Sequence, residues 1–205
     1  MLPEYQVGPF DRHWFAVING WATAGPLVDH VAVVLAKYAP EIWAVIFLLL
    51  WFWPPLRANR ARKAVVYAVV AGVLALIVNF ALGHIFPYRP RPFVLLGVAH
   101  MHLLILHHAA DTSFPSDHAA GSFAFAVGLF FARPRDGWWA LLLAAAVGLA
   151  RIVAGLHWPT DVLVGALVGV GSGLVVLAGR AALEGLVMWL FRLFQFQRAR
   201  QGERL

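Results

Sequence analysis

The chain has 205 residues, of which 61% are hydrophobic and 13% are charged, and its net charge is +6. Soluble domains contain about 25% charged residues, so this composition predicts a protein whose main solvent is lipid. Cysteine is absent, which excludes disulfides, thiolate nucleophiles and Cys-ligated metals. The basic residues flank apolar stretches instead of forming one patch, so we expect no nucleic-acid partner. We interpret residues 1–205 as a single domain, because no repeat or low-complexity tract divides them.

Apolar stretches of the length that crosses a bilayer recur along the chain. A transmembrane helix needs about 20 mostly apolar residues. In chain order the predicted spans cover residues 31–53, 63–84, 116–132, 137–155 and 160–179. The sequence therefore predicts an all-α fold, a polytopic integral-membrane bundle of five transmembrane helices with its core over roughly residues 30–180.

Two flanking segments are predicted to lie at the membrane surface. Residues 1–30 mix aromatic side chains with Asp11, Arg12 and His13, which is typical of an outer interfacial segment. Residues 181–205 place apolar side chains at helical spacing, which favours an amphipathic helix on the cytoplasmic surface. The alternative, a sixth span, would move the basic tail outside. The start of the chain lacks the pattern of a removable signal peptide, so we expect the spans themselves to direct it to the membrane.

The basic residues predict the orientation of the bundle, because short cytoplasmic loops carry an excess of Lys and Arg. They gather in the first connection, the third connection and the tail, at Arg57, Arg60, Arg62, Lys63, Arg133, Arg135, Arg180, Arg192, Arg198, Arg200 and Arg204. These segments share one side of the predicted bundle. The loop 85–115 and the turn 156–159 are therefore expected to face outward.

That outer face receives three polar segments, "HIFPYRPRPF" (84–93), "SFPSDHAAG" (113–121) and "ARIVAGLHWPTD" (150–161). Ionisable groups at membrane depth are costly unless they are paired, so this cluster indicates a functional site. Arginines from different helices can bind a tetrahedral oxyanion and stay charged in a partly dry site. A proline at 115 fits the first turn of a helix, so the amides that follow it are predicted to donate to a phosphate.

The histidines of the cluster suit phosphoryl transfer. One neutral imidazole can attack phosphorus while another protonates the departing oxygen. Asp161 follows His157 by four residues and is predicted to accept the other imidazole N–H and to stabilise a charged phosphohistidine. Because Pro159 lies between them, we expect a helix to begin there.

In order and spacing, these residues resemble the motifs of the type 2 phosphatidic acid phosphatase superfamily, integral-membrane lipid phosphatases related to vanadium haloperoxidases and glucose 6-phosphatase. The family motifs K-x6-R-P, P-S-G-H and S-R-x5-H-x3-D stand here as His84-x6-Arg91-Pro92, Pro115-Ser116-Asp117-His118 and Ala150-Arg151-x5-His157-x3-Asp161. The chain departs from the family at three positions, namely His84 for lysine, Asp117 for glycine and Ala150 for serine. The resemblance covers roughly residues 30–180.

The resemblance implies a role for each site residue. It makes His157 the nucleophile, Asp161 its partner, and His118 the general acid that later activates water. It makes the phosphate ligands Arg91, Arg151 and Ser116, joined by the amide of Asp117 and by His84. The sequence by itself leaves Arg89 either in this cluster or as an interfacial anchor.

Within the superfamily, "RPRPF" followed by "SFPSDHA" in a short chain is most similar to the bacterial undecaprenyl diphosphate phosphatases. This likeness implies a polyprenyl diphosphate as the lipid substrate, and a multi-pass protein of the bacterial plasma membrane whose site faces outward. Phosphatidylglycerophosphate, phosphatidic acid and lipid A phosphatases share the core and stay open as alternatives. A vanadium haloperoxidase and a non-catalytic lipid or anion transporter are less favoured. The sequence sets no oligomeric state.

The outer loop also contains His100, His102, His107 and His108, which raise the hypothesis of a metal site. Their spacing does not place three ligands on one helix face, and a phosphohistidine route needs no metal. We therefore expect neither a metal nor a cofactor, and a lid or surface-loop role for these histidines.

Overall fold

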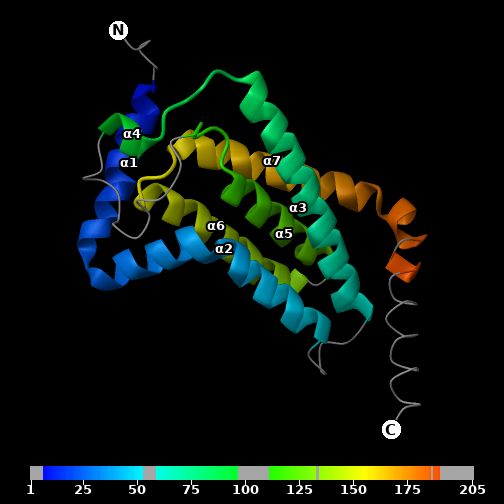
Figure 1. Cartoon of the computed structure of the whole chain (residues 1–205). Helices are drawn as coiled ribbons and strands as arrows, with labels where there is room; N and C mark the ends of the chain where they lie inside the picture. Colours follow the sequence, from blue (N-terminus) through cyan, green and yellow to red (C-terminus); the bar gives the residue numbers. More distant parts are fainter. Residues whose placement is uncertain (1–6, 53–58, 97–110, 133, 186, 190–205) are drawn as a thin grey trace, which may run out of the picture.

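The computed structural model describes residues 7–52, 59–96, 111–132, 134–185 and 187–189. Every regular element within these ranges is helical, which confirms the predicted all-α class (Figure 1). The four loop histidines from His100 to His108, and the tail from residue 190, lie outside the described residues. In chain order the elements are α1 (Pro9–Asn19), η1 (Gly20–Ala24), α2 (Pro26–Phe52), α3 (Asn59–Ile85), α4 (Pro92–Leu96), α5 (Asp117–Ala132), α6 (Pro134–Val153) and α7 (Pro159–Ala178).

Each of the predicted spans coincides with a long helix, but the helices are not equivalent. By length and hydropathy, α2, α3, α6 and α7 can each cross a membrane. The fifth, α5, has 16 residues and rises about 24 Å. The chain is therefore a multi-pass membrane protein in which four described helices have the length of a span and α5 is shorter, so the predicted count of five spans is not established.

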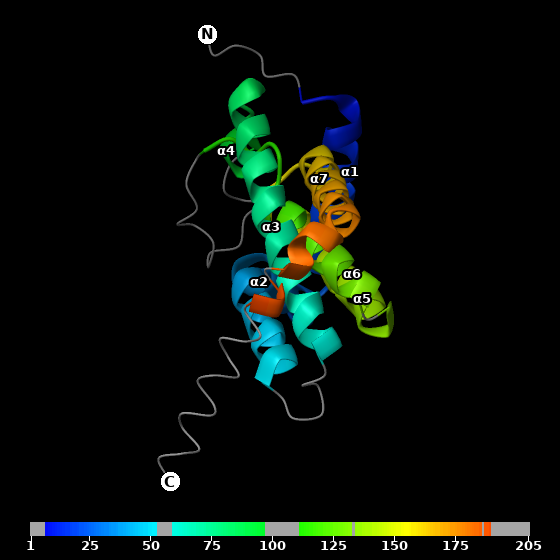
Figure 2. The same ribbon diagram turned by 90° about the vertical axis from the view of Figure 1, so that its right-hand side faces the viewer.

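Helix α5 occupies the centre of the bundle, where it packs against α3, α6 and α7 (Figures 1 and 2). Small side chains allow this close approach. On α7, a Cβ atom at Gly165 would lie 2.5 Å from the Ser116 carbonyl oxygen, and one at Gly169 would lie 2.3 Å from the Ala120 carbonyl oxygen. The α5 side of the contact is formed by fully buried alanines, Ala119, Ala120 and Ala124. This packing fixes the start of α5 beside the second turn of α7.

Helix α1 packs on α6 and α7 at the end of the bundle that carries α4 (Figures 1 and 2). Asp11, Phe15 and Asn19 are buried, and they share one helix face because they recur at four-residue spacing. The side-chain amide of Asn19 donates to the Val153 carbonyl oxygen at 2.8 Å. The segment predicted to be interfacial therefore contains a helix with a buried polar face toward the protein, while Phe10 on it is exposed.

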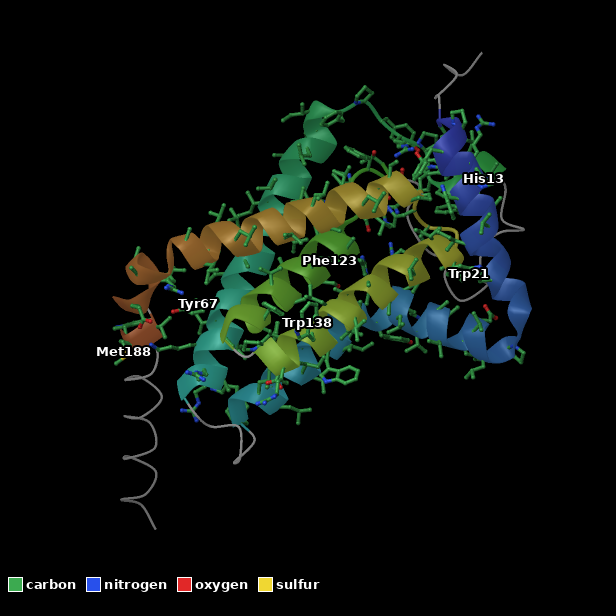
Figure 3. All side chains as sticks on the ribbon, turned by 180° about the vertical axis from the view of Figure 1, so that it is seen from behind. His13, Trp21, Tyr67, Phe123, Trp138 and Met188 are labelled. Atoms are coloured by element: carbon green, nitrogen blue, oxygen red, sulfur yellow. The ribbon has the colours of Figure 1, made fainter. Side chains whose placement is uncertain are left out.

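The start of the tail contacts α3 at the other end of the bundle. Residues 180–185 and 187–189 are helical. Both carboxylate oxygens of Glu184 lie 2.9 Å from Lys63 Nζ, and the Tyr67 hydroxyl donates to the same carboxylate at 3.2 Å. In Figure 3, Tyr67 and Met188 lie at the end opposite His13 and Trp21. We call these the opposite end and the site end.

Candidate active site

The three polar segments predicted from the sequence meet at the site end. The indole N–H of Trp158 donates to the Pro90 carbonyl oxygen at 2.9 Å, which joins the third segment to the first. The amide of Ser116 donates to the Asp161 carbonyl oxygen at 3.1 Å, which joins the second to the third. Segments far apart in sequence are thus held in register by backbone groups and not by their charged side chains alone.

Between these segments lies a cavity of about 370 Å³. The first segment contributes Arg91, and His84 at the end of α3. The second segment contributes His118, which is half-buried in the first turn of α5. Its lining includes most of the predicted site residues, namely His84, Arg91, Asp117, His118, Arg151 and His157. The structure therefore brings together six of the eight predicted residues in one cavity.

His157 presents one ring nitrogen to two guanidinium groups. Its Nε2 atom lies 3.1 Å from Nη1 of Arg91 and 3.2 Å from Nη2 of Arg151. A guanidinium can only donate, so Nε2 carries the lone pair and the proton is on Nδ1. Nδ1 donates to the Ser113 carbonyl oxygen at 2.8 Å. The geometry therefore assigns the tautomer that a nucleophilic Nε2 requires.

The charge state of His157 agrees with this tautomer. The imidazole is almost completely buried. Burial, and then the positive charges of Arg151 and Arg91, hold the pKa of His157 well below the usual value for histidine. The ring is therefore neutral at physiological pH.

Arg91 is fixed from several directions. Its Nε donates to Asp111 at 2.9 Å, its Nη1 to the Leu156 carbonyl oxygen at 3.1 Å, and its Nη2 to the Thr112 carbonyl oxygen at 3.3 Å. Asp111 was not among the residues predicted from the sequence. Because protein groups already orient the guanidinium, its position is set before any substrate binds.

Arg151 is oriented by a break in α2. Pro40 has no N–H, so the carbonyl of Ala36, four residues earlier, lacks its usual helical donor. The backbone is non-helical at Tyr38, between these two residues. Nη1 of Arg151 donates to the Ala36 carbonyl oxygen at 2.8 Å. Pro40 thus leaves the Ala36 carbonyl free to accept a hydrogen bond from Arg151, and this bond orients the guanidinium at the cavity.

Asp161 differs from its prediction. Its Oδ2 atom lies 3.7 Å from His157 Nδ1, beyond hydrogen-bond length, because the Ser113 carbonyl already accepts the Nδ1 hydrogen. Asp161 instead accepts the Trp158 amide at 2.8 Å, as an acidic residue in the first turn of a helix commonly does, and pairs with Arg89. The Ser113 carbonyl, and not the Asp161 carboxylate, therefore orients the imidazole ring.

Three other predicted phosphate ligands contact protein groups in this structure. Ser116 is fully buried at the start of α5, and its backbone amide donates to the Asp161 carbonyl oxygen. It is not among the described residues that line the cavity. The phosphate contact of Ser116 therefore stays a prediction. His84 is exposed at the end of α3, and its Nδ1 donates to the Phe80 carbonyl oxygen at 2.8 Å. Oδ1 of Asp117 accepts the Asn79 amide at 2.6 Å.

Arg89 is part of an ion-paired network and is not an interfacial anchor. Its guanidinium pairs with both Asp11 and Asp161, and donates to the Thr160 hydroxyl at 2.8 Å. The sequence predicts Asp11 at the membrane surface and does not single out Thr160. A sequence signal for Asp11 was present, because the four-residue spacing of Asp11, Phe15 and Asn19 places them on one helix face.

Comparison with known proteins places these residues in a family. The PAP2 superfamily model matches residues 63–184, which contain all three polar segments. The undecaprenyl-diphosphatase BcrC of Bacillus subtilis is 30% identical over 88% of this chain and 90% of its own length. A lipid A 1-phosphatase of Rhizobium johnstonii is 26% identical over 73% of this chain and 67% of its own length.

The fold has a match among solved structures as well. The crystal structure of Aquifex aeolicus LpxE superimposes with a TM-score of 0.62 at 25% identity, covering 87% of this chain and 99% of that one. Together with the relatives, the family match supports a phosphoric ester hydrolase that acts on a lipid. The helical bundle, the cavity at its end and the matched motifs lead to one conclusion: the chain belongs to the PAP2 superfamily.

Proposed function

We propose that the chain removes the terminal phosphate of a prenyl diphosphate, with undecaprenyl diphosphate as the leading substrate, through a phosphohistidine at His157. One observation carries the proposal: the Nε2 lone pair of His157 lies between the guanidiniums of Arg91 and Arg151 in the cavity. When phosphate oxygens take over the arginine hydrogen bonds, phosphorus lies in front of this lone pair. The arrangement favours in-line attack and stabilises charge on the transferring group.

In the first step, Nε2 forms a bond to phosphorus, and the bond from phosphorus to the lipid-linked oxygen breaks. His118 donates a proton to that oxygen, which leaves as the lipid monophosphate. The imidazole of His157 keeps its Nδ1 hydrogen and becomes positively charged. The Ser113 carbonyl accepts this hydrogen, and the negative charge of Asp161 lies 3.7 Å away.

In the second step, water attacks phosphorus while His118 takes one of its protons. The bond from Nε2 to phosphorus breaks, inorganic phosphate leaves, and His157 returns to its neutral form. Each group thus ends the cycle in the protonation state in which it began.

The substrate proposal rests on the undecaprenyl-diphosphatase relative and on the surroundings of the cavity. Phe80 lines the cavity while 69% of its surface is exposed, so it connects the polar interior to the apolar flank of α3. An amphiphile can place its phosphates in the cavity and its chain along this flank. The lipid A 1-phosphatase relative favours a lipid A phosphate as a second candidate.

A lipid panel tests both the substrate and the nucleophile. Phosphate release by the purified protein would be measured with undecaprenyl diphosphate, lipid A, phosphatidylglycerophosphate and phosphatidic acid. We expect undecaprenyl diphosphate to be cleaved fastest, and His157→Ala to lower kcat by at least about 10³-fold. His30→Ala is a matched control, since that exposed histidine bonds only the backbone of its own helix in the described contacts. Faster cleavage of another lipid would reassign the substrate. A folded and fully active His157→Ala variant would show that His157 is not the nucleophile.

The proposed outward orientation has its own test, because the chain lacks cysteine. Ile85 at the end of α3 and Arg135 at the start of α6 are both exposed, and each can be changed to a single cysteine. We expect a membrane-impermeant maleimide to label Ile85→Cys in intact cells and Arg135→Cys only after permeabilisation. The reverse labelling pattern would show that the site faces the cytoplasm.

A further inference from the structure

The carboxylate of Asp11 is buried beside the site although it belongs to α1. Its side chain is 5% exposed. Oδ1 accepts the Thr160 amide at 2.9 Å, and Oδ2 accepts the Thr160 hydroxyl at 2.7 Å and pairs with Arg89. A buried charge is costly unless its partners are complete, so this degree of pairing indicates a defined position. Both partners of Asp11 also adjoin Asp161.

Arg89 joins the two carboxylates. Its Nη2 atom pairs with Asp11, while its Nη1 atom donates to Oδ1 of Asp161. The fork of a guanidinium is rigid, so the position of one carboxylate constrains the other. The Trp158 amide holds the second oxygen of Asp161. The orientation of Asp161 toward His157 is therefore set by groups that Asp11 helps to hold.

The charges of this group also matter for the reaction. With both carboxylates ionised, the group formed by Asp11, Arg89 and Asp161 has a net charge of −1, because the two carboxylates share one guanidinium. Without the charge of Asp11, Arg89 would neutralise Asp161 alone, and less negative charge would face His157 when its imidazole becomes positive. In a site shielded from water, such a change affects the transition state more than the binding of the substrate.

We infer that Asp11 is a positioning residue of the active site, which acts on Asp161 through Arg89. This inference rests on the proposed roles of His157 and Asp161. It makes α1 part of the catalytic unit, although α1 lies outside the family match at residues 63–184. A purely structural role for Asp11, in docking α1 onto the bundle, is the competing explanation.

Asn19 separates the two explanations. It lies two turns further along the same face of α1 and docks the helix through the Val153 carbonyl oxygen. It carries no charge, so Asn19→Ala weakens the docking of α1 without changing the charge beside Asp161. Asp11→Asn keeps the shape and removes the charge, and Asp11→Glu keeps the charge.

The experiment compares Asp11→Asn, Asn19→Ala, Asp161→Asn and the double variant of Asp11 and Asp161 in steady-state assays. Undecaprenyl diphosphate and phosphatidic acid are used in parallel, so that a wrong lipid assignment does not affect the comparison. We expect Asp11→Asn to lower kcat about 10-fold and to keep KM within about twofold of wild type. In the Asp161→Asn background, the same change should lower kcat by less than about a further twofold. Asn19→Ala should lower the melting temperature and keep kcat.

Other results would overturn the inference. Equal losses of kcat in Asp11→Asn and Asn19→Ala, or additive losses in the double variant, would show that Asp11 only docks α1. If Asp11→Asn does not fold, Asp11→Glu decides: kcat within about threefold of wild type supports the role of charge, and a loss as large as about 10-fold contradicts it. If Asp161→Asn alone were fully active, the proposed role of Asp161 would fail first, and the inference would fail with it.

Discussion

Ion pairs occur at both ends of the bundle, but in different surroundings. At the site end, the side chains of Arg89 and Asp161 are 19% and 0% exposed. At the opposite end, those of Lys63 and Glu184 are 30% and 43% exposed. Removing one partner of a buried pair leaves an uncompensated charge and costs about 3–5 kcal/mol. An exposed pair is screened by water and salt and contributes little.

The site end also contains charges that do not neutralise one another. Arg91 and Arg151 approach the same nitrogen of His157, and both are buried. Two like charges held together in a protein interior oppose folding unless an anion joins them. The difference between the two ends is therefore that the site end is organised to receive an anion, whereas the opposite end joins the tail to α3.

The largest effect is expected when one of these arginines loses its charge. Arg151→Met keeps most of the side-chain volume and removes the hydrogen bonds that we propose this arginine makes to the transferring phosphate, so kcat/KM should fall about 10²–10³-fold. Phosphate release at several lipid concentrations measures this effect. Arg135→Met, at an exposed position at the start of α6, is the matched control and should keep the wild-type value. A loss below about tenfold for Arg151→Met would show that this arginine does not contact the reacting group.

Much of this site end was predictable, because hydropathy and motif spacing depend on side chains alone. The long apolar stretches had to form helices, since lipid offers the backbone no other partners. The contacts that involve backbone groups were not predictable in this way. The Ser113 carbonyl replaces Asp161 at His157, and Pro40 exposes the carbonyl that holds Arg151. Asp11 was missed because its partners are 78 and 149 residues away in the sequence.

A smaller effect is expected at Asp117, the negative side chain that lines the cavity where the family has glycine. Its carboxylate accepts a hydrogen bond from the Asn79 side chain and, in the proposed function, would repel an anionic substrate. Asp117→Asn should lower KM about three- to tenfold, because removing one repulsive charge at short range is worth about 1 kcal/mol. Initial rates over a range of lipid concentrations measure KM, with kcat as the internal control. A higher KM in the variant would mean that the carboxylate binds part of the substrate.

A still smaller effect is expected from acid. Burial, and then Arg151 and Arg91, lower the pKa of His157, so the neutral nucleophile persists below the usual histidine value of about 6.5. Between pH 7.5 and 6.5, the rate of phosphoenzyme formation should stay nearly constant, whereas a histidine with its usual pKa would go from about 90% to about 50% neutral. Single-turnover measurements at saturating lipid give this rate. An acid midpoint at or above pH 6.5 would contradict the shift.

The smallest effect is expected at the opposite end, where Lys63→Met breaks the exposed pair. The Tyr67 hydroxyl still donates to Glu184, while the pKa of Glu184, which the hydrogen bond from Lys63 lowers, should rise toward its usual value. We expect kcat/KM and the melting temperature to match wild type within error, because water solvates both side chains once they separate. Arg89→Met is the buried counterpart and should lower both quantities. Equal losses of activity in the two variants would mean that the opposite end is coupled to the cavity through α3, because Lys63 and His84 lie on that same helix.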